Sequence, residues 1–221
     1  MFSRLRFLMV AVVAILATPA LAQQDQQDIV EKSRIALNAL RNDADHPNLN
    51  TTLGRAKAVL IIPSLLKAGF LVGGEGGSGV LLVRQADGSW SPPAFYTMAS
   101  GSIGLQVGVQ DSEVLFTVMT DKGLKQVMQN QFKMGADASI ALGPIGGGVE
   151  AATTLNMGAD IYAFSRSKGA FAGGSFEGSY IKARDEWNKL YYGQAVTVDD
   201  IVAGKVSNAG ADQLRQALAG R

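Results

Sequence analysis

The spacing of apolar residues changes near residue 57, from a helical period to a strand-like one. In residues 27–42, "QDIVEKSRIALNALRN", apolar side chains recur every three or four positions and end with Leu37 and Leu40. That spacing predicts an amphipathic helix, for which Asp28 is a candidate N-cap. Its apolar face would dock either on the rest of the protein or, as a second choice, on a membrane.

After this segment, apolar and polar residues alternate with a period of two, which is typical of half-buried strands. Strands are expected at 68–73, 79–84, 102–110, 114–119, 133–141, 160–166 and 169–181, and further helices at 120–131, 185–193 and 207–220. The continuous apolar run 114–119 indicates a strand buried on both faces. The order predicts an α+β fold, a strongly curved, barrel-like antiparallel sheet with an N-terminal helix and a few packed helices. Whether the sheet closes into a barrel stays open.

Three glycines, Gly74, Gly76 and Gly79, match the spacing G-x-G-x-x-G of a dinucleotide-binding turn. Such a turn needs a helix directly after it, because the helix N-terminus receives the pyrophosphate. Here an apolar, strand-like run follows instead, "VLLVRQADGSW". We therefore expect no nucleotide, and interpret the segment as a β-hairpin with strands 68–73 and 79–84 joined by a glycine-rich turn.

The first 22 residues have the features of a secretory signal peptide. Arg4 and Arg6 precede an apolar run of 11 residues, and "TPALA" ends with Ala20 and Ala22 in an A-x-A cleavage pattern. The run is short for a membrane anchor, the alternative interpretation. We expect cleavage after Ala22, a single domain over 23–221, and a periplasmic or secreted protein.

Composition narrows the chemistry. The 221 residues carry 20 basic and 19 acidic side chains, no Cys and one His. A nearly neutral chain is not a general nucleic-acid binder. Without Cys, and with His46 expected in a surface loop, thiol catalysis and the usual zinc sites are not expected. The carboxylates show no spacing that singles out a catalytic pair, so we expect neither an enzyme nor a bound cofactor.

Several long blocks of sequence occur in a characteristic order. They are "RAKAVLIIPSLLKAGFLVGGEGGSGVLLVR", "GSWSPPAFYTMASGSIGLQVGVQ", "LGPIGGGVEAAT", "IYAFSRSKGAFAGGSFEGSYI" and "YYG". In this order they resemble the SYLF domain family over residues 50–193. The resemblance implies a lipid-binding module: eukaryotic SYLF domains bind phosphoinositide-rich membranes and some bind actin filaments, while bacterial relatives are exported single-domain proteins.

This sequence departs from the family pattern in two respects. The signal peptide would remove the chain from the cytosol, so actin and phosphoinositides are not expected partners. Gly147 in "GPIGGG" stands where eukaryotic members carry a basic residue, which argues against a headgroup contact at that turn.

A module that binds a membrane surface needs cations for phosphate and an apolar group to insert. The candidate headgroup-binding cations are Arg166, Lys168, Lys57, Lys67, Lys122 and Lys125. The first choice is the "SRSKG" segment, expected to be a hairpin tip, with Phe171 after it as the inserting side chain.

Two functions compete at this stage. The leading hypothesis is an exported, non-catalytic protein that binds anionic phospholipid headgroups or a membrane surface. The alternative is a structural or protein-interaction module of the cell envelope, whose exposed sheet edges bind a protein partner.

Overall fold

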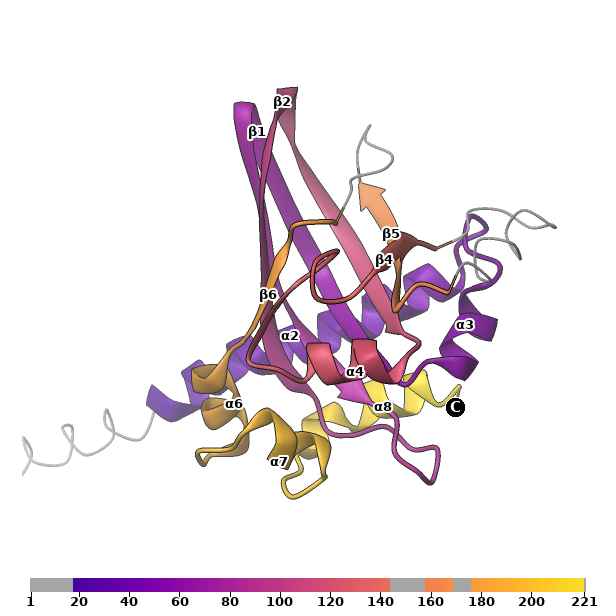
Figure 1. The fold of residues 1–221 in the computed structure, drawn as a ribbon. Coiled ribbons are helices and arrows are strands. Elements are labelled where there is room, and N and C mark those ends of the chain that lie inside the picture. Colours follow the sequence, from indigo (N-terminus) through magenta and orange to yellow (C-terminus); the bar gives the residue numbers. More distant parts are fainter. Residues whose placement is uncertain (1–17, 144–157, 169–175, 221) are drawn as a thin grey trace, which may run out of the picture.

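The computed structural model describes residues 18–143, 158–168 and 176–220. Figure 1 shows the elements in chain order: α2 (Thr18–Arg41), α3 (Leu49–Arg55), β1 (Ala58–Val83), β2 (Ala94–Val118), α4 (Asp121–Val127), β3 (Gln131–Lys133), β4 (Ile140–Leu142), β5 (Ile161–Lys168), β6 (Tyr180–Ala183), α6 (Asp185–Tyr192), α7 (Val198–Val202), a 3₁₀ turn η1 (Ala209–Ala211) and α8 (Asp212–Leu218). Helices surround a strongly curved sheet, so the predicted α+β class is confirmed.

The two longest strands, β1 and β2, form one antiparallel ribbon. Their register runs from Ala58 opposite Val118 to Leu81 opposite Ala94, with two register shifts on the way. The strands contain 26 and 25 residues, several times the usual length of a strand in a globular protein. Figure 1 shows the middle of this ribbon, where both strands bend back, projecting beyond the helices, while the two ends of the ribbon lie at its base. We call this bend the projecting end.

The predicted hairpin with strands 68–73 and 79–84 is wrong. β1 continues through the glycine-rich segment as extended backbone, and none of the glycines at 73–79 has a positive φ. The turn of the ribbon lies after β1 instead, where Gly88 adopts a φ of 82° directly after Asp87. The glycine run did mark an unusual part of the backbone, but glycine permits close packing of extended backbone as well as turns, and here it serves the packing.

The glycines of β1 lie where this strand crosses itself. A Cβ added to Gly79 would overlap the carbonyl oxygen of Ile61, and one added to Gly77 would overlap that of Ser64. The second half of β1 therefore folds back over the first half, backbone against backbone. Only a residue without a side chain allows this approach.

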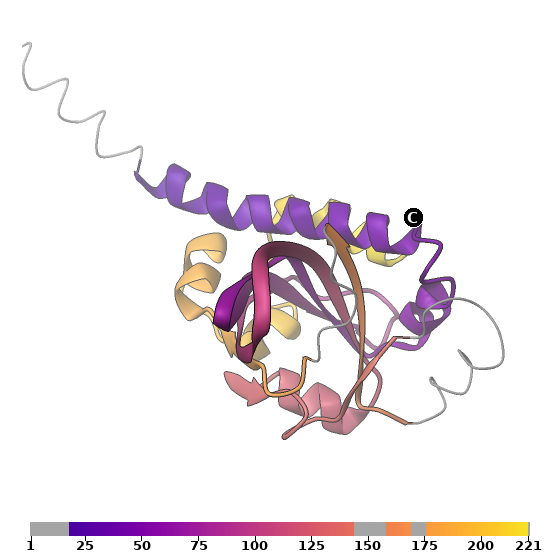
Figure 2. The same cartoon turned by 90° about the horizontal axis from the view of Figure 1, so that it is seen from above.

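The folded ribbon joins the remaining strands into one curled sheet. The strand order is β3-β6-β2-β5-β4, with β1 paired to β2. The first residues of β2 pair with β6 and its last residues pair with β5, so β2 connects both ends of the sheet. Every pairing between these strands is antiparallel except that of β4 with β5. Figure 2 shows the curl from above, with α2 along one side.

Both faces of the sheet are covered, which gives two apolar cores. Alternate residues of β1 divide between them: Val59 and Ile61 pack with α2, α3 and α8, whereas Leu60 and Ile62 pack with α4 and α7. The expected strand 114–119 is confirmed, because its residues from Val114 to Val118 are buried on both faces.

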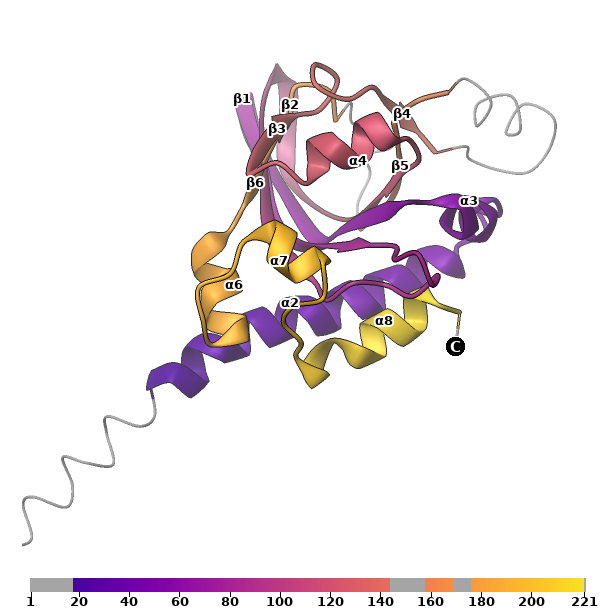
Figure 3. The same ribbon diagram turned by 60° about the horizontal axis from the view of Figure 1, so that its bottom comes forward.

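The N-terminal helix is longer than its pattern indicated. α2 begins at Thr18, so Asp28 lies inside the helix and is not its N-cap. Its buried residues include Leu37 and Leu40, which contact the sheet. Figure 3 shows α8 beside α2, so the first and last helices of the described chain form one layer.

Other local signals had mixed outcomes. Thr120 caps α4 by accepting a hydrogen bond from the Gly123 N–H, and α6 ends at Gly193 in the left-handed region. The short helices α3 and α7 were not expected from the pattern. Within the described ranges, no helix combines the length and apolar character that spanning a membrane requires.

Two expected strands are largely wrong. In 133–141, the chain turns after β3, because Gly135 has a φ of 81° and the Asp137 carboxylate accepts a hydrogen bond from the Lys133 N–H. In 169–181, only the last two residues belong to a described strand, β6, and 169–175 lie outside the described residues. Gly135 and Asp137 favour a turn, and this preference outweighs the alternation of apolar and polar residues.

The crossing of β1 predicts a large effect of one methyl group. Gly79→Ala should lower the free energy of unfolding by about 3 kcal/mol or more, because its Cβ meets backbone that cannot rotate away. Urea unfolding followed by circular dichroism measures the change. Gly76→Ala is the matched control: its Cβ would lie 3.6 Å from the Met98 oxygen, an ordinary contact. Equal stability of the two variants would contradict the crossing.

Candidate functional site

The six predicted cations fall into two groups, one at the base of the β1/β2 ribbon and one toward its projecting end. Lys57, Lys122 and Lys125 lie around α4, at the base of the ribbon. Lys57 forms an ion pair with Asp121 at 2.7 Å. Lys67 lies ten residues further along β1, or roughly 33 Å at the rise of an extended strand. The cations therefore do not converge on one headgroup.

The group at α4 is built around one buried carboxylate, that of Asp160. It accepts hydrogen bonds from the Thr120 hydroxyl at 2.5 Å and from the Ser139 N–H and hydroxyl at 2.9 and 2.8 Å, and Lys122 Nζ lies 3.2 Å away. Burial opposes the charged form, but these hydrogen bonds outweigh it and hold the pKa of Asp160 well below its usual value. An ionised carboxylate with this many donors ties loops together and is unsuited to general acid chemistry.

The second group lies where β5 pairs with β2. Arg166 stands opposite Glu113, with 3.2 Å between its Nε and the carboxylate, and Lys168 stands opposite Asp111. The expected hairpin tip at "SRSKG" is therefore wrong for the residues up to Lys168, because Arg166 and Lys168 both belong to the strand β5. Phe171, the predicted inserting residue, lies outside the described residues, as does Gly147.

Exposed apolar side chains occur on the same face of the sheet as Arg166. Leu66 is 53% exposed and Val109 is 78% exposed. The register pairs Leu66 with Asp111 and residue 68 with Val109, so the two apolar side chains are diagonal neighbours on one face. Arg166 is 40% exposed, against 12% for Glu113, so the cation is the outer member of its pair.

We call this surface, made of Leu66, Val109 and Arg166 with Lys168 in register, the ribbon-end face. It lies toward the projecting end of the β1/β2 ribbon (Figure 1). Lys67 is on the opposite face, beside Gln110. The sequence pattern did not single out Leu66 and Val109, because the predicted hairpin interrupted β1 close to Leu66. The alternation of apolar and polar residues around them was nevertheless a usable signal.

The single histidine is buried, so the expectation of a surface loop is wrong. His46 is 5% exposed, its Nε2 lies 3.0 Å from the Ser165 carbonyl oxygen, and its ring packs edge-on against Phe164. It fastens the loop after α2 to β5. In the described part of the chain, His and acidic side chains form no group of three or more that would hold a metal ion.

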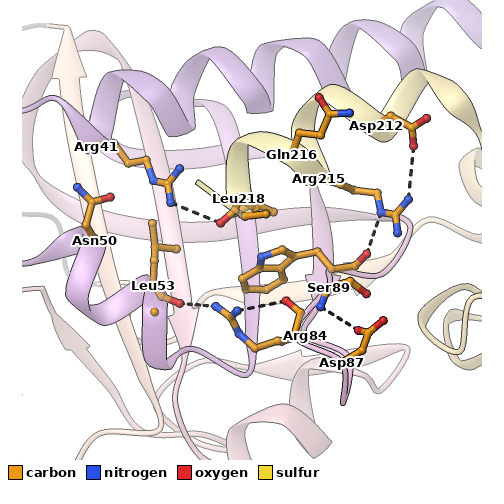
Figure 4. A pocket seen from close by; sticks show the side chains of 14 residues that line it. Arg41, Asn50, Leu53, Arg84, Asp87, Ser89, Asp212, Arg215, Gln216 and Leu218 are labelled. Carbon is orange, nitrogen blue, oxygen red and sulfur yellow. Dashed lines mark hydrogen bonds and ion pairs between the residues drawn. The ribbon is translucent and has the colours of Figure 1, made fainter. Parts of the chain in front are cut away.

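A second feature is a hollow of about 630 Å³ at the base of the protein, where β1 turns into β2, away from the projecting end of the ribbon. Figure 4 shows its walls: the end of α2, helix α3, the β1–β2 turn and helix α8. Three arginines line it, Arg41, Arg84 and Arg215, together with Trp90. These residues are far apart in sequence, and no local pattern pointed to them.

The chain is similar to a group of larger proteins. A family model described as "Ysc84: Las17-binding protein actin regulator" matches residues 99–221. The chain is 40% identical over 157 residues to LAS seventeen-binding protein 3 of Saccharomyces cerevisiae, covering 70% of this chain and 34% of that protein. It is 32% identical over 165 residues to SH3 domain-containing YSC84-like protein 1 of Homo sapiens, covering 74% of this chain and 48% of that protein. The chain thus spans between about a third and a half of these relatives.

The contacts of Asp160 predict a pH-dependent loss of stability. Asp160→Asn should lower the free energy of unfolding at pH 7 by about 2–3 kcal/mol, because the amide cannot accept from all the donors that the carboxylate satisfies. Since the folded pKa lies below the unfolded one, the carboxylate stabilises the fold above about pH 4 and loses this effect as pH falls further.

Thermal unfolding between pH 7 and pH 3 measures the difference in stability between the wild type and Asp160→Asn. It should narrow as pH falls, because the unfolded chain takes up a proton at Asp160 that the folded carboxylate does not. The control is Asp87→Asn in an exposed turn, where we expect a change below about 1 kcal/mol. A difference that stayed constant down to pH 3 would show that Asp160 does not act through its charge.

Proposed function

Because this chain belongs to the Ysc84 family, which comprises the SYLF domains, we propose that it is a non-catalytic module that binds anionic phospholipid at a membrane surface. The resemblance inferred from the sequence blocks is confirmed by the family match. The family description and the names of the relatives refer to binding and regulation. The ribbon-end face is the part of this chain that fits a lipid surface best.

The observation that carries the proposal is the exposure of Leu66 and Val109 on the face of the sheet that also carries Arg166. Leu66 and Val109 are diagonal neighbours, and Arg166 lies on the same face of the sheet beyond Asp111, so the three form a small amphipathic patch toward the projecting end of the protein. Aliphatic groups gain free energy on entering the acyl region, and a cation gains about 1 kcal/mol near an anionic surface. A projecting ribbon reaches a flat membrane without hindrance from the helices at its base.

The balance of charge at this face makes lipid binding weak and dependent on salt. Glu113 and Asp111 lie next to the cations, so the net charge of the face is small. Because an anionic membrane repels these carboxylates while it attracts Arg166, the apolar contacts must supply a large part of the affinity. We therefore infer a reversible association with the membrane.

Export is the second part of the proposal. α2 runs through the expected cleavage site after Ala22, but its described buried side chains begin at Gln26. Cleavage after Ala22 would shorten the helix and retain every described buried side chain of α2, the first of which is Gln26. This supports the proposal of a periplasmic or secreted protein.

A protein partner is the second candidate function, and the relatives' names favour it. One relative is named a Las17-binding protein, and the family is described as an actin regulator. In this chain, β3 and β4 are the outermost strands of the sheet order and would accept an added strand. This candidate predicts a defined cross-linked complex that does not require lipid.

The ribbon-end face predicts which substitutions weaken membrane binding. Val109→Asp and Leu66→Asp should each reduce co-sedimentation with phosphatidylglycerol vesicles by about tenfold at low salt, because a carboxylate replaces an inserting group. Binding to phosphatidylcholine vesicles should be weak for every protein. Leu190→Asp is the matched control, because Leu190 is also exposed, at 43%, but lies on α6.

Equal loss of binding in all three variants would remove the ribbon end from the proposal. No sedimentation of the wild-type protein with either lipid would favour the protein-partner candidate instead. Arg166→Gln adds a second test, since it should reduce the salt dependence of binding more than the binding at high salt.

Export predicts a defined N-terminus. When the full chain is expressed in a Gram-negative host, the periplasmic protein should begin at Gln23, as measured by intact mass. Ala20→Leu together with Ala22→Leu should block cleavage and leave the uncut chain in the membrane fraction. Uncut wild-type protein in the cytoplasmic fraction would contradict export.

A further inference from the structure

The hollow shown in Figure 4 has an unusual electrostatic arrangement. Three guanidinium groups reach it from three elements: Arg41 from α2, Arg84 from the end of β1 and Arg215 from α8. The ribbon-end face does not require this arrangement, because the hollow lies at the base of the protein, where β1 turns into β2 (Figure 1). Its function is therefore separate from the proposed membrane contact.

Backbone carbonyl groups, and not carboxylates, hold most of these guanidinium groups. Arg41 donates to the carbonyl oxygens of Ala217 and Leu218 at the end of α8. Arg84 donates to the carbonyl oxygens of Ala56 and Leu53, at 2.9 and 2.7 Å. These bonds fix both positions and leave the positive charges in place.

Acidic side chains compensate the charge only in part. Asp212 lies 3.4 Å from Arg215, and Asp87 accepts a hydrogen bond from the Ser89 N–H in its own turn. No carboxylate in the described ranges forms an ion pair with Arg41 or Arg84. Burial also lowers the pKa of both of these arginines, which is the cost of holding their charge away from water.

Hydrogen-bond donors remain available in the hollow. A guanidinium carries five N–H groups, and Arg41 uses two of them, Arg84 three and Arg215 two. The Arg41 Nε and the Trp90 Nε1 are buried donors without a partner in the described structure. Trp90 is 1% exposed and the Arg84 guanidinium stacks on its ring at 4.4 Å.

From this geometry we propose that the hollow binds a small organic oxyanion, a carboxylate or phosphate, between Arg41, Arg84 and Arg215. Arginine forks match these groups because two parallel N–H donors meet two oxygens. Leu53 and Leu218 also line the hollow and would contact the carbon part of the ligand. A hollow of about 630 Å³ is larger than a bare inorganic ion needs and lies within the range of small-molecule sites.

The test uses the full chain, with citrate and glycerol 3-phosphate as probes and glycerol as the uncharged counterpart. At low salt, both oxyanions should raise the melting temperature and bind in calorimetry with a Kd of about 1 mM or below, whereas glycerol should do neither. The absence of binding to both oxyanions at about 10 mM would overturn the proposal, as would equal stabilisation by glycerol.

Two isosteric substitutions at the rim locate the site without disturbing the arginines. Gln216→Glu on α8 and Asn50→Asp on α3 each add a negative charge to the hollow, and both residues are exposed. Each should weaken oxyanion binding by about tenfold. Gln129→Glu, which adds the same charge at an exposed position after α4, is the matched control and should bind like wild type. Equal weakening in all three would overturn the proposal.

A further arm separates a free metabolite from a lipid headgroup as the source of the oxyanion. A soluble short-chain phosphatidic acid carries the same phosphomonoester as glycerol 3-phosphate. Tenfold tighter binding of this lipid, lost in Gln216→Glu, would identify a headgroup, and equal binding would identify a free ligand. Vesicle binding through Leu66 should be unchanged in Gln216→Glu, so the failure of one proposal is distinguishable from the failure of the other.

Discussion

The close contact of β1 with itself is the constraint on which the rest of this structure depends. At Gly77 and Gly79 the backbone of one half of the strand lies against carbonyl oxygens of the other half. A ribbon of more than twenty residues per strand would otherwise project as a long two-stranded arm, which is only marginally stable in water. Crossing over itself gives the ribbon two layers and allows helices to cover both outer surfaces.

The base and the projecting end of the ribbon consequently differ in structure. At its base, both faces of β1 are buried and Asp160 ties the surrounding loops together. Toward the projecting end, α2 no longer covers the sheet, and Leu66 and Val109 face solvent. The same strand thus supplies core and surface, and the change between them occurs within a few residues.

Local chemistry in the sequence predicted elements whose stability is local. The cap at Thr120, the stop at Gly193 and the doubly buried strand around Phe116 were all predictable, because each depends on nearby residues. The path of β1 was not, since a glycine run favours a turn or a backbone crossing equally until the partner strand is known. The same reason explains the misplaced turn at Arg166, which pairs with a strand more than fifty residues earlier. The arginines of the hollow are brought together by α2 and α8, which are far apart in the chain. The spacing of apolar residues along the sequence does not predict a contact between such distant segments.

The pairing of α2 with α8 has a consequence for the order of folding. A ribosome makes α2 long before α8, yet the two helices lie side by side and Arg41 caps the end of α8. Until the last residues emerge, part of the apolar face of α2 has no neighbour to cover it. Contacts so distant in sequence form late and slow the folding of a chain. A chain that stays open until α8 has been made is also one that can still be threaded through a narrow translocation channel.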